Sequence, residues 1–449
     1  MGLTARAGMR SEVIALKCRY LRQYPPARRD APAIELSMRA VKILLFSTLF
    51  PNSEQARHGI FVENRLRHLL ADCPVSAQVV APVPWFFSSA PVFGAYAAYT
   101  RVPRSEERHG VTILHPRYLV VPGLSWHVAP RLLYHGARET VRRLRQEGYD
   151  FDLIDAHYYY PDGVAAVMLG RELGVPVVIT ARGNDLSLLP SFRRPRQSIQ
   201  WAEARAAASI TVCSALADAL VALGGRPERV TVLRNGVDLE VFRPVDRDAA
   251  RAEFGLTGDV LLSVGHLIER KGNHVTIEAL RELPDTTLLL VGDGPEQGAL
   301  RALARRCGVS DRVRFLGARP QGQLAALYAA ADALVLASSR EGWANVLLEA
   351  MACGTPVVAT AIWGTPEVVA APEAGVLVES RTPSAIADGV RKLLAARPER
   401  GATRAYAERF DWRSTSIGQY ELFCRVLDAQ SAASTVTAGA SGAYSAGRK

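Results

Sequence analysis

Two glutamates with seven residues between them, Glu341 and Glu349, are the side chains of this sequence best placed for chemistry. They lie in residues 338–356, where a polar loop follows an apolar run and leads into a helical run. The N-terminal N–H groups of such a helix suit a diphosphate. Glu349, one turn inside the helix, could accept hydrogen bonds from vicinal hydroxyls such as those of a ribose. Glu341, on the loop, could reach a different part of the same ligand.

Polar, glycine-containing segments follow two other apolar runs in the same half of the chain. Residues 265–272 and residues 292–295 each come directly after such a run. Ligands of an open parallel sheet bind at the carboxyl ends of its strands, so these segments belong with the glutamates. Two other interpretations stay open at this point. Glu341 could be only a favourable partner of the helix dipole, and residues 292–294 could be only a tight turn.

The composition is that of a globular protein, with 449 residues, 49% of them hydrophobic and 22% charged. This length predicts two domains, and no apolar run approaches the ~20 residues that cross a bilayer, so a soluble chain is expected. The formal charge of +10 favours an anionic partner such as a phosphorylated small molecule or an acidic lipid surface. Basic and aromatic residues do not interleave in a compact stretch, so nucleic acid is not expected as a partner.

Neither the cysteines nor the aspartate pairs of this sequence predict a metal site. The six cysteines are far apart, without a CxxC, and are expected to be reduced thiols. Asp150 with Asp152, and Asp246 with Asp248, form Asp-x-Asp pairs. One pair precedes a predicted strand and the other lies in a linker, so both are predicted to be solvated surface.

Short apolar runs alternate with helical segments, and this alternation occurs twice along the chain. The first series of predicted strands covers residues 41–47, 77–83, 111–114, 153–158, 176–181 and 210–214. The second covers residues 260–265, 287–291, 313–316, 333–337, 356–360 and 375–378. Continuous apolar strands separated by helices indicate parallel sheets that are covered on both faces. The turn-rich residues 233–245 mark the join, so two doubly wound α/β domains are predicted, at 39–233 and 234–405.

The two ends of the chain are expected to lie outside these domains. Residues 1–38 form a basic extension without the apolar core of a signal peptide, and they are predicted to be disordered. Residues 406–428 are predicted to be a helix that packs back on the N-terminal domain, because its aromatic side chains need a docking surface. Residues 429–449 are mainly small and polar and are predicted to be disordered.

Several segments together resemble a known family. REGWANVLLEAMACGTPVVAT, which contains both glutamates, resembles the E-x7-E region of glycosyltransferase family 4. The segments VGHLIERKG, VGDGP and NGVD, and PNSEQARHGIFVENR, HYYYPDG and TARGNDL nearer the start, are similar to other parts of that family. The resemblance covers about residues 39–425 and is greatest to bacterial teichuronic-acid and exopolysaccharide transferases. It implies the GT-B fold, in which two Rossmann-like domains face each other across a cleft.

The resemblance also implies roles for individual residues. Glu349 would hold the donor ribose, Glu341 would contact the donor sugar, and Lys271 would neutralise the diphosphate without a metal. The other donor-binding residues would be Gly59, His266, Arg270, Gly292, Gly294, Asn345 and Val346. His157 would act near the sugar, with Tyr158, Tyr159, Arg182 and Asp185 on the acceptor side. Many members have arginine where this chain has His266, so neutralisation could depend on Arg270 or Lys271 instead.

The implied reaction is sugar transfer from a UDP or GDP sugar to an acceptor hydroxyl, with retention of the anomeric configuration. The nucleotide sugar would be a co-substrate and no further cofactor is expected. The acceptor would be a glycan or lipid-linked intermediate of a cell-surface polysaccharide. A cytoplasmic location is expected. At the inner face of the cell membrane, the basic surface would meet anionic lipid. A nucleotide-sugar 2-epimerase of the same fold and a non-catalytic nucleotide-sugar-binding protein stay open as alternatives.

Overall fold

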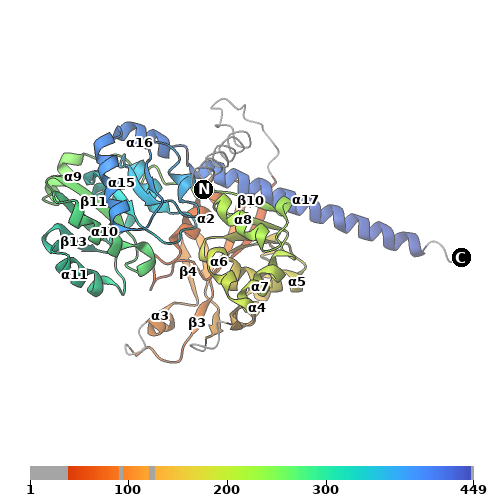
Figure 1. Ribbon diagram of the computed structural model, residues 1–449. Coiled ribbons are helices and arrows are strands. Elements are labelled where there is room, and N and C mark those ends of the chain that lie inside the picture. Colours follow the sequence, from red (N-terminus) through yellow and green to blue (C-terminus); the bar gives the residue numbers. More distant parts are fainter. Residues whose placement is uncertain (1–38, 91–94, 121–126, 446–449) are drawn as a thin grey trace, which may run out of the picture. The chain divides into compact units, whose positions relative to one another are not determined.

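Two open parallel sheets, each built from consecutive strand–helix units, form most of the chain (Figure 1). The computed structural model describes residues 39–90, 95–120 and 127–445. The predicted basic extension, residues 1–38, and the end of the predicted tail, residues 446–449, lie outside the described residues. Among the described residues, no helix has both the length and the apolar character needed to cross a bilayer.

The first sheet has eight strands, of which only β4 is antiparallel to its neighbour. In spatial order they are β10 (Val230–Val232), β9 (Ala208–Thr211), β8 (Val177–Ala181), β7 (Leu153–His157), β1 (Val41–Phe46), β2 (Val75–Val80), β5 (Val111–Leu114) and β4 (Ser105–Arg108). Its helices are α2 (Ile60–Asp72), α3 (Ala95–Arg101), α4 (Ala129–Gln146), α5 (Val164–Leu173), α6 (Asn184–Ser187), α7 (Arg193–Glu203) and α8 (Ser214–Ala222). The order of the strands reverses between β1 and β7, which is the switch point where ligands of such sheets bind.

The second sheet has six strands, all parallel. In spatial order they are β13 (Val313–Gly317), β12 (Thr286–Val291), β11 (Asp259–Val264), β14 (Ala333–Leu336), β15 (Val357–Thr360) and β16 (Gly375–Val378). Its helices are α9 (Arg247–Glu253), α10 (Asn273–Ala279), α11 (Gln297–Arg306), α12 (Gln321–Ala330), α13 (Asn345–Ala352), α14 (Thr365–Val368), α15 (Pro383–Ala396) and α16 (Arg400–Ala407). Here the switch point lies between β11 and β14.

The predicted fold class is confirmed, since two doubly wound α/β domains follow one another along the chain. The first sheet ends at Val232 and the second begins at Asp259, on either side of the predicted join. Residues 77–83, predicted as one strand, are divided between β2 and β3 (Val83–Trp85), because Pro82 has no N–H to donate. β3 pairs with β6 (Arg117–Leu119) in a separate two-stranded sheet.

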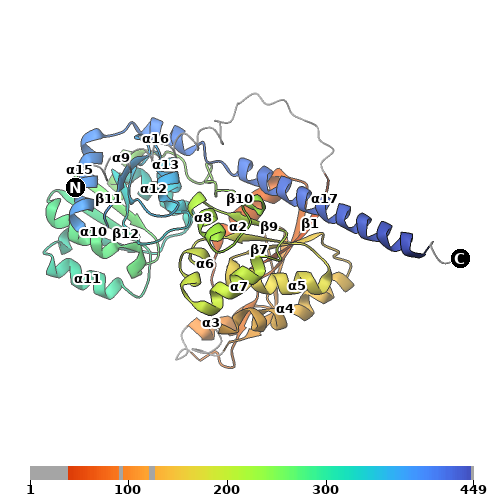
Figure 2. The same ribbon diagram turned by 45° about the vertical axis from the view of Figure 1, so that its right-hand side comes forward.

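The helix α17 (Trp412–Ser445) packs back on the first domain, as predicted. Figure 2 shows α17 beside α2, and its buried residues Tyr420, Phe423 and Val426 share a core with Val62 and Leu66 of α2. Its limits differ from those predicted. The chain breaks after α16, so the helix begins at Trp412, and it continues to Ser445, through the segment predicted to be a disordered tail. The alanines of that segment favour helix, which composition arguments about burial did not weigh.

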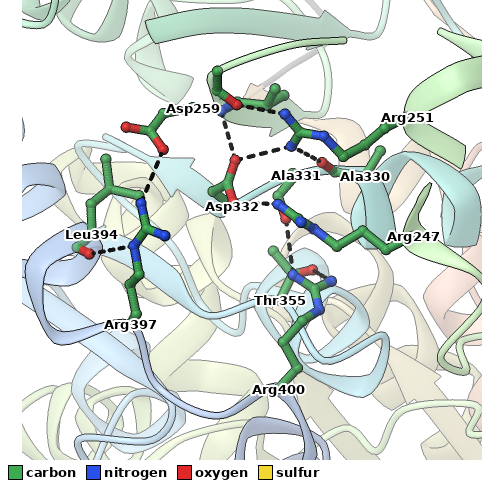
Figure 3. A network of polar contacts seen from close by, with 12 residues as sticks. Arg247, Arg251, Asp259, Ala330, Ala331, Asp332, Thr355, Leu394, Arg397 and Arg400 are labelled. Carbon is green, nitrogen blue, oxygen red and sulfur yellow. Dashed lines mark hydrogen bonds and ion pairs between the residues drawn. The ribbon is translucent and has the colours of Figure 1, made fainter. Parts of the chain in front are cut away.

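An arginine-rich network holds two helices to the amino edge of the second sheet (Figure 3). Asp332, just before β14, accepts from Arg247 at 2.5 Å and from Arg251 at 3.2 Å, both on α9. The same carboxylate accepts the Val260 N–H at 2.9 Å, at the start of β11. Arg400 of α16 donates to the Ala331 carbonyl at 3.1 Å and to Thr355 Oγ1 at 2.7 Å. Asp332 therefore joins the linker helix α9 to the sheet.

Replacing Asp332 with alanine is expected to lower the free energy of unfolding by about 2–4 kcal/mol, because two partly buried guanidinium groups lose their carboxylate. Thermal or urea unfolding measures this loss. Asp388→Ala is the matched control, since Asp388 pairs with Arg391 on an exposed part of α15. The control should change stability by less than ~1 kcal/mol. Equal unfolding curves for the two variants would contradict the structural role of Asp332.

Candidate functional site

The two loops at the switch point of the second sheet lie directly against each other. Gly272, at the end of the loop after β11, has a φ of +74°, and a Cβ there would lie 1.8 Å from the Ala337 carbonyl oxygen at the end of β14. Only glycine permits this approach. As a result Lys271 and Glu341, one on each loop, lie side by side.

Glu341 is the centre of a compact ion cluster. Its Oε1 atom accepts from Lys271 Nζ at 2.7 Å and from Ser338 Oγ at 2.7 Å, and Arg270 Nη1 lies at 3.5 Å. The side chain is 8% exposed. Burial by itself raises the pKa of Glu341, but the charges of Lys271 and Arg270 and the two hydrogen bonds outweigh it, so the pKa is lowered. The carboxylate is therefore ionised at neutral pH, beside two cations.

Glu349 lies in a different electrostatic environment, one turn into α13. Its Oε2 accepts from the Tyr328 hydroxyl of α12 at 2.7 Å. Burial raises the pKa of Glu349 to about 7, and the hydrogen bond from Tyr328 opposes that rise only in part. Burial is therefore the dominant influence on this pKa, and Glu349 is divided between its neutral and ionised forms near neutral pH.

Glu349 faces a cavity of about 530 Å³ that is lined by both domains. The first domain contributes Arg57, His58, Gly59 and Ile60, from the loop after β1 and the start of α2. The second domain contributes residues that follow β11, β12 and β13 and the start of α13, among them Gly265, His266, Gly292, Asp293, Arg319 and Val346. A volume of this size accommodates a nucleotide-sized ligand.

The glycines in the loop after β12 are required by the close packing of the backbone there. A Cβ at Gly292 would lie 1.9 Å from the Gly265 carbonyl oxygen, and one at Gly294 would lie 2.4 Å from the Leu267 carbonyl oxygen. The tight turn that the sequence left open is therefore real. The same turn also presents Asp293 to the cavity, where it lies 3.5 Å from Arg57 and 3.9 Å from His266.

Five of the residues predicted to bind the donor line this cavity: Gly59, His266, Gly292, Val346 and Glu349. Arg270, Lys271 and Glu341 form the neighbouring ion cluster described above. Gly294 serves the turn, and Asn345 lines a smaller adjoining cavity together with Glu349. Sequence reasoning missed Arg57, His58, Arg319 and Tyr328. The first two could have been found, because they directly precede Gly59, whereas the partnership of Tyr328 with Glu349 depends on how α12 packs on α13.

The structure places His157, predicted to act near the sugar, inside the first domain. Its side chain is 1% exposed, with Nε2 at 3.2 Å from Asp155 Oδ2, and its Nδ1 contacts the Arg182 guanidinium. Burial lowers the pKa of His157 to about 4, with the Asp155 charge opposing, so the ring is neutral. The geometry gives His157 the role of a support for Arg182, whose guanidinium it contacts.

The other acceptor-side residues divide into two pairs. Asp185 is fully buried and accepts the N–H groups of Tyr159, Arg182 and Gly183 at 2.7–3.1 Å, and the Tyr159 hydroxyl contacts Ser209 Oγ at 2.6 Å. These two side chains are buried and hold the loop together. Arg182 is also buried, with 8% of its surface exposed, whereas Tyr158 is half-buried. Tyr158 has a φ of +83°, a strained conformation for a non-glycine residue that is common at functional sites.

The loops of the two domains touch next to Glu341. A Cβ at Gly342 would lie 2.2 Å from the Arg182 carbonyl oxygen, so the backbones meet there. Arg182 also donates to Asn235 Oδ1 at 3.1 Å, and the Asn235 amide donates to Asn345 Oδ1 at 3.2 Å. This chain of bonds connects the acceptor-side edge, the linker between the domains and the start of α13.

The two Asp-x-Asp pairs have structural roles. Asp246 caps α9 by accepting the N–H groups of Asp248 and Ala249, and Asp152 accepts the Lys42 N–H at 2.8 Å. Among the residues that the structure describes, no group of three His, Cys, Asp or Glu side chains could hold a metal ion.

If Glu349 holds the donor ribose, donor affinity is expected to rise with pH between about 6 and 8, because the ribose hydroxyls would donate to its ionised form and its pKa is about 7. Below that pKa the free protein must lose a proton to bind, and the affinity falls by up to about tenfold per pH unit. Calorimetric titration with a nucleoside diphosphate measures this profile. Glu349→Gln should flatten it, and an unchanged slope in that variant would assign the titration to another group.

Comparison with known proteins now identifies the family. Residues 246–410 match the family model for glycosyl transferases group 1, and residues 92–241 match that for glycosyltransferase family 4. A D-inositol 3-phosphate glycosyltransferase of Segniliparus rotundus is 33% identical over 344 residues, which are 68% of this chain and 76% of the relative. TuaC of Bacillus subtilis, assigned to teichuronic acid biosynthesis, is 28% identical over 362 residues, 78% of this chain and 89% of that protein.

Solved structures share the fold. Sucrose-phosphate synthase from Thermosynechococcus elongatus superposes with a TM-score of 0.70 at 21% identity, over 87% of this chain and 100% of the other. HepE from Anabaena, in complex with UDP-glucose, gives a TM-score of 0.64 at 21% identity, over 87% and 100% of the two chains. With two sheets in tandem, a cavity between their carboxyl edges and these sequence matches, the chain belongs to glycosyltransferase family 4 and has the GT-B fold.

Proposed function

We propose that this glycosyltransferase transfers a sugar from a UDP or GDP sugar to an acceptor hydroxyl, with retention of configuration and without a metal. The observation that carries the proposal is that two sites of different charge lie next to each other. Glu349 faces a nucleotide-sized cavity with a pKa near 7, and the Lys271, Arg270 and Glu341 cluster lies beside it. HepE, which shares the fold, has been solved with UDP and with UDP-glucose.

In this proposal each group has a separate task. Glu349 accepts from the ribose hydroxyls through the oxygen that Tyr328 leaves available. Lys271 and Arg270 balance the negative charge that develops on the diphosphate as the bond between it and the anomeric carbon breaks. Glu341 orients Lys271 and reaches the donor sugar. The acceptor oxygen bonds to the anomeric carbon, and its proton passes to the departing phosphate, so no protein base is needed.

The acceptor is proposed to be lipid-linked, because two segments of the first domain carry exposed aromatic side chains and basic side chains follow the second of them. Trp85 is 49% exposed and Phe87 70% exposed, and both follow the carboxyl end of β2. Phe192, also exposed, ends the loop after β8. Three arginines then start α7, where the helix dipole disfavours positive charge and the first turn of the helix contains no acid. Aromatic rings with adjacent arginines suit a membrane interface with anionic lipid.

Binding to vesicles that contain anionic phospholipid tests this part of the proposal. Trp85→Ser with Phe87→Ser is expected to reduce co-sedimentation about tenfold or more, since two large apolar side chains no longer insert. The matched control, Ile417→Ser, removes an exposed apolar residue of α17 and should bind as the wild type does. If the wild type fails to bind anionic vesicles, or if the control loses as much binding as the double variant, the membrane contact is wrong.

The reaction itself is tested by one assay. The full chain is incubated with a panel of UDP, GDP and ADP sugars, with and without a membrane lipid extract, and nucleotide release and products are followed. Nucleotide release that depends on the acceptor, with a product whose anomeric configuration is that of the donor sugar, supports a retaining transferase. Epimerised donor without an acceptor would indicate the 2-epimerase, and binding without turnover would indicate a sensor. Unchanged rates in EDTA are expected for a metal-independent reaction.

A further inference from the structure

The donor cavity contains a cation from the first domain that no task described so far uses. Arg57 lies in the loop between β1 and α2, and its Nη2 atom is 3.5 Å from Asp293 Oδ2, in the loop after β12. Both residues line the cavity. The ion pair therefore runs from one domain to the other across the space that a donor would fill.

This ion pair is one that a ligand can replace at small cost. The side chains of Arg57 and Asp293 are 59% and 63% exposed. Exposed pairs of this kind contribute only about 0–1 kcal/mol. The backbone beneath Arg57 is well fixed by contrast, because Gly59 has a φ of +69° and a Cβ there would lie 2.3 Å from the Leu49 carbonyl carbon and oxygen. Arg57 therefore combines a fixed backbone with a weak ion pair, as expected of a side chain that exchanges one partner for another.

The charges around the cavity show what the new partner would be. The second domain lines the cavity with one permanent cation, Arg319, and with two carboxylates, Asp293 and Glu349, which when ionised would repel the phosphates of a donor. Of the four first-domain residues that line it, Arg57 carries a permanent charge, whereas burial lowers the pKa of His58 despite its bond to the Thr48 carbonyl. A guanidinium binds phosphate in a bidentate, charge-assisted manner, more strongly than it binds an exposed carboxylate.

We propose that Arg57 is a further donor-binding residue, delivered by the first domain, and that Asp293 is the carboxylate that holds it in the absence of donor. When a nucleoside-diphosphate sugar binds, the Arg57 guanidinium leaves Asp293 and pairs with the diphosphate. This inference rests on the proposed function. It adds a contact to the diphosphate from the first domain, whereas Lys271 belongs to the second, so the donor itself connects the two domains.

The test measures binding of UDP, UMP, GDP and GMP to the full chain by calorimetric titration. Arg57→Gln is expected to weaken the binding of nucleoside diphosphates about 10–100-fold, because a charge-assisted pair with the diphosphate is lost. The binding of nucleoside monophosphates should weaken less. Arg57→Lys should recover part of the loss. Arg391→Gln is the matched control, because Arg391 forms an exposed ion pair with Glu282 away from the cavity, and it should leave binding unchanged.

A double-variant cycle separates partner exchange from simple repulsion. Asp293→Asn is expected to strengthen diphosphate binding several-fold, because Arg57 is released from its carboxylate and a repulsive charge is removed. In the Arg57→Gln background the gain should be smaller. An equal gain in both backgrounds, or diphosphate binding by Arg57→Gln that matches the wild type, overturns the inference while the proposed function stands. Failure of the wild type to bind either diphosphate overturns the proposed function first.

Discussion

Lys271→Met is expected to lower kcat by about 10²–10³-fold, because in the proposed reaction Lys271 supplies charge that stabilises the departing diphosphate. Lys271 is the residue closest to Glu341, at 2.7 Å, and it lies on the loop that Gly272 fixes against β14. Arg270, at 3.5 Å from the same carboxylate, compensates only in part because it is also bonded to the Arg340 carbonyl. Steady-state kinetics with saturating donor measures the loss.

Lys271→Arg is the conservative control for this prediction, and it should retain more activity than the methionine variant because the positive charge is kept. Both variants should still bind a nucleoside, since Glu349 and Tyr328 lie outside the ion cluster. A kcat for Lys271→Met within about threefold of the wild type would remove Lys271 from the reaction.

Glu341→Gln is expected to lower kcat by a similar factor, about 10²-fold or more, while the affinity for the nucleoside diphosphate changes little. The amide keeps the size and the bond from Ser338 but loses the charge that holds Lys271 and Arg270. The two cations would then lack their carboxylate, and stability is expected to fall by about 1–3 kcal/mol. Kinetics and thermal unfolding of the same sample measure the two effects.

The double variant Lys271→Met, Glu341→Gln distinguishes stability from catalysis. In this variant Lys271 no longer lacks its carboxylate and only Arg270 does, so stability should recover part of the way toward the wild type. Activity should stay low, because both functional groups are gone. Recovery of activity together with stability would mean that the ion pair only supports the fold.

The fold could be predicted well from the sequence because its strands are apolar on both faces. The predicted strands 153–158, 176–181 and 333–337 contain β7, β8 and β14, in which every residue is buried. The strands that were missed lack that signal. β4 reads SEER and is an edge strand with one neighbour, and β10 has only three residues, none fully buried. Hydrophobic patterning detects burial, so short edge strands escape it.

The candidate site was predicted only in part, because the sequence does not show how deeply each side chain is buried. Glu341, Lys271 and Glu349 follow from their positions after strands and inside a helix, and the structure brings the first two together. Strand-end position does not reveal which way a side chain points. His157 ends β7 yet faces inward, behind Arg182. Arg57 was overlooked because its importance comes from Asp293, which lies more than two hundred residues away in the sequence.

A crystal structure of the full chain with its tightest-binding nucleoside diphosphate would show where the donor lies. We expect a ribose hydroxyl within hydrogen-bond distance, about 2.6–3.2 Å, of Glu349, and the terminal phosphate beside Lys271. Glu341 should remain at the end of that phosphate where the sugar would begin. A nucleotide bound elsewhere, or one whose phosphates point away from Lys271 and Arg270, would contradict the account.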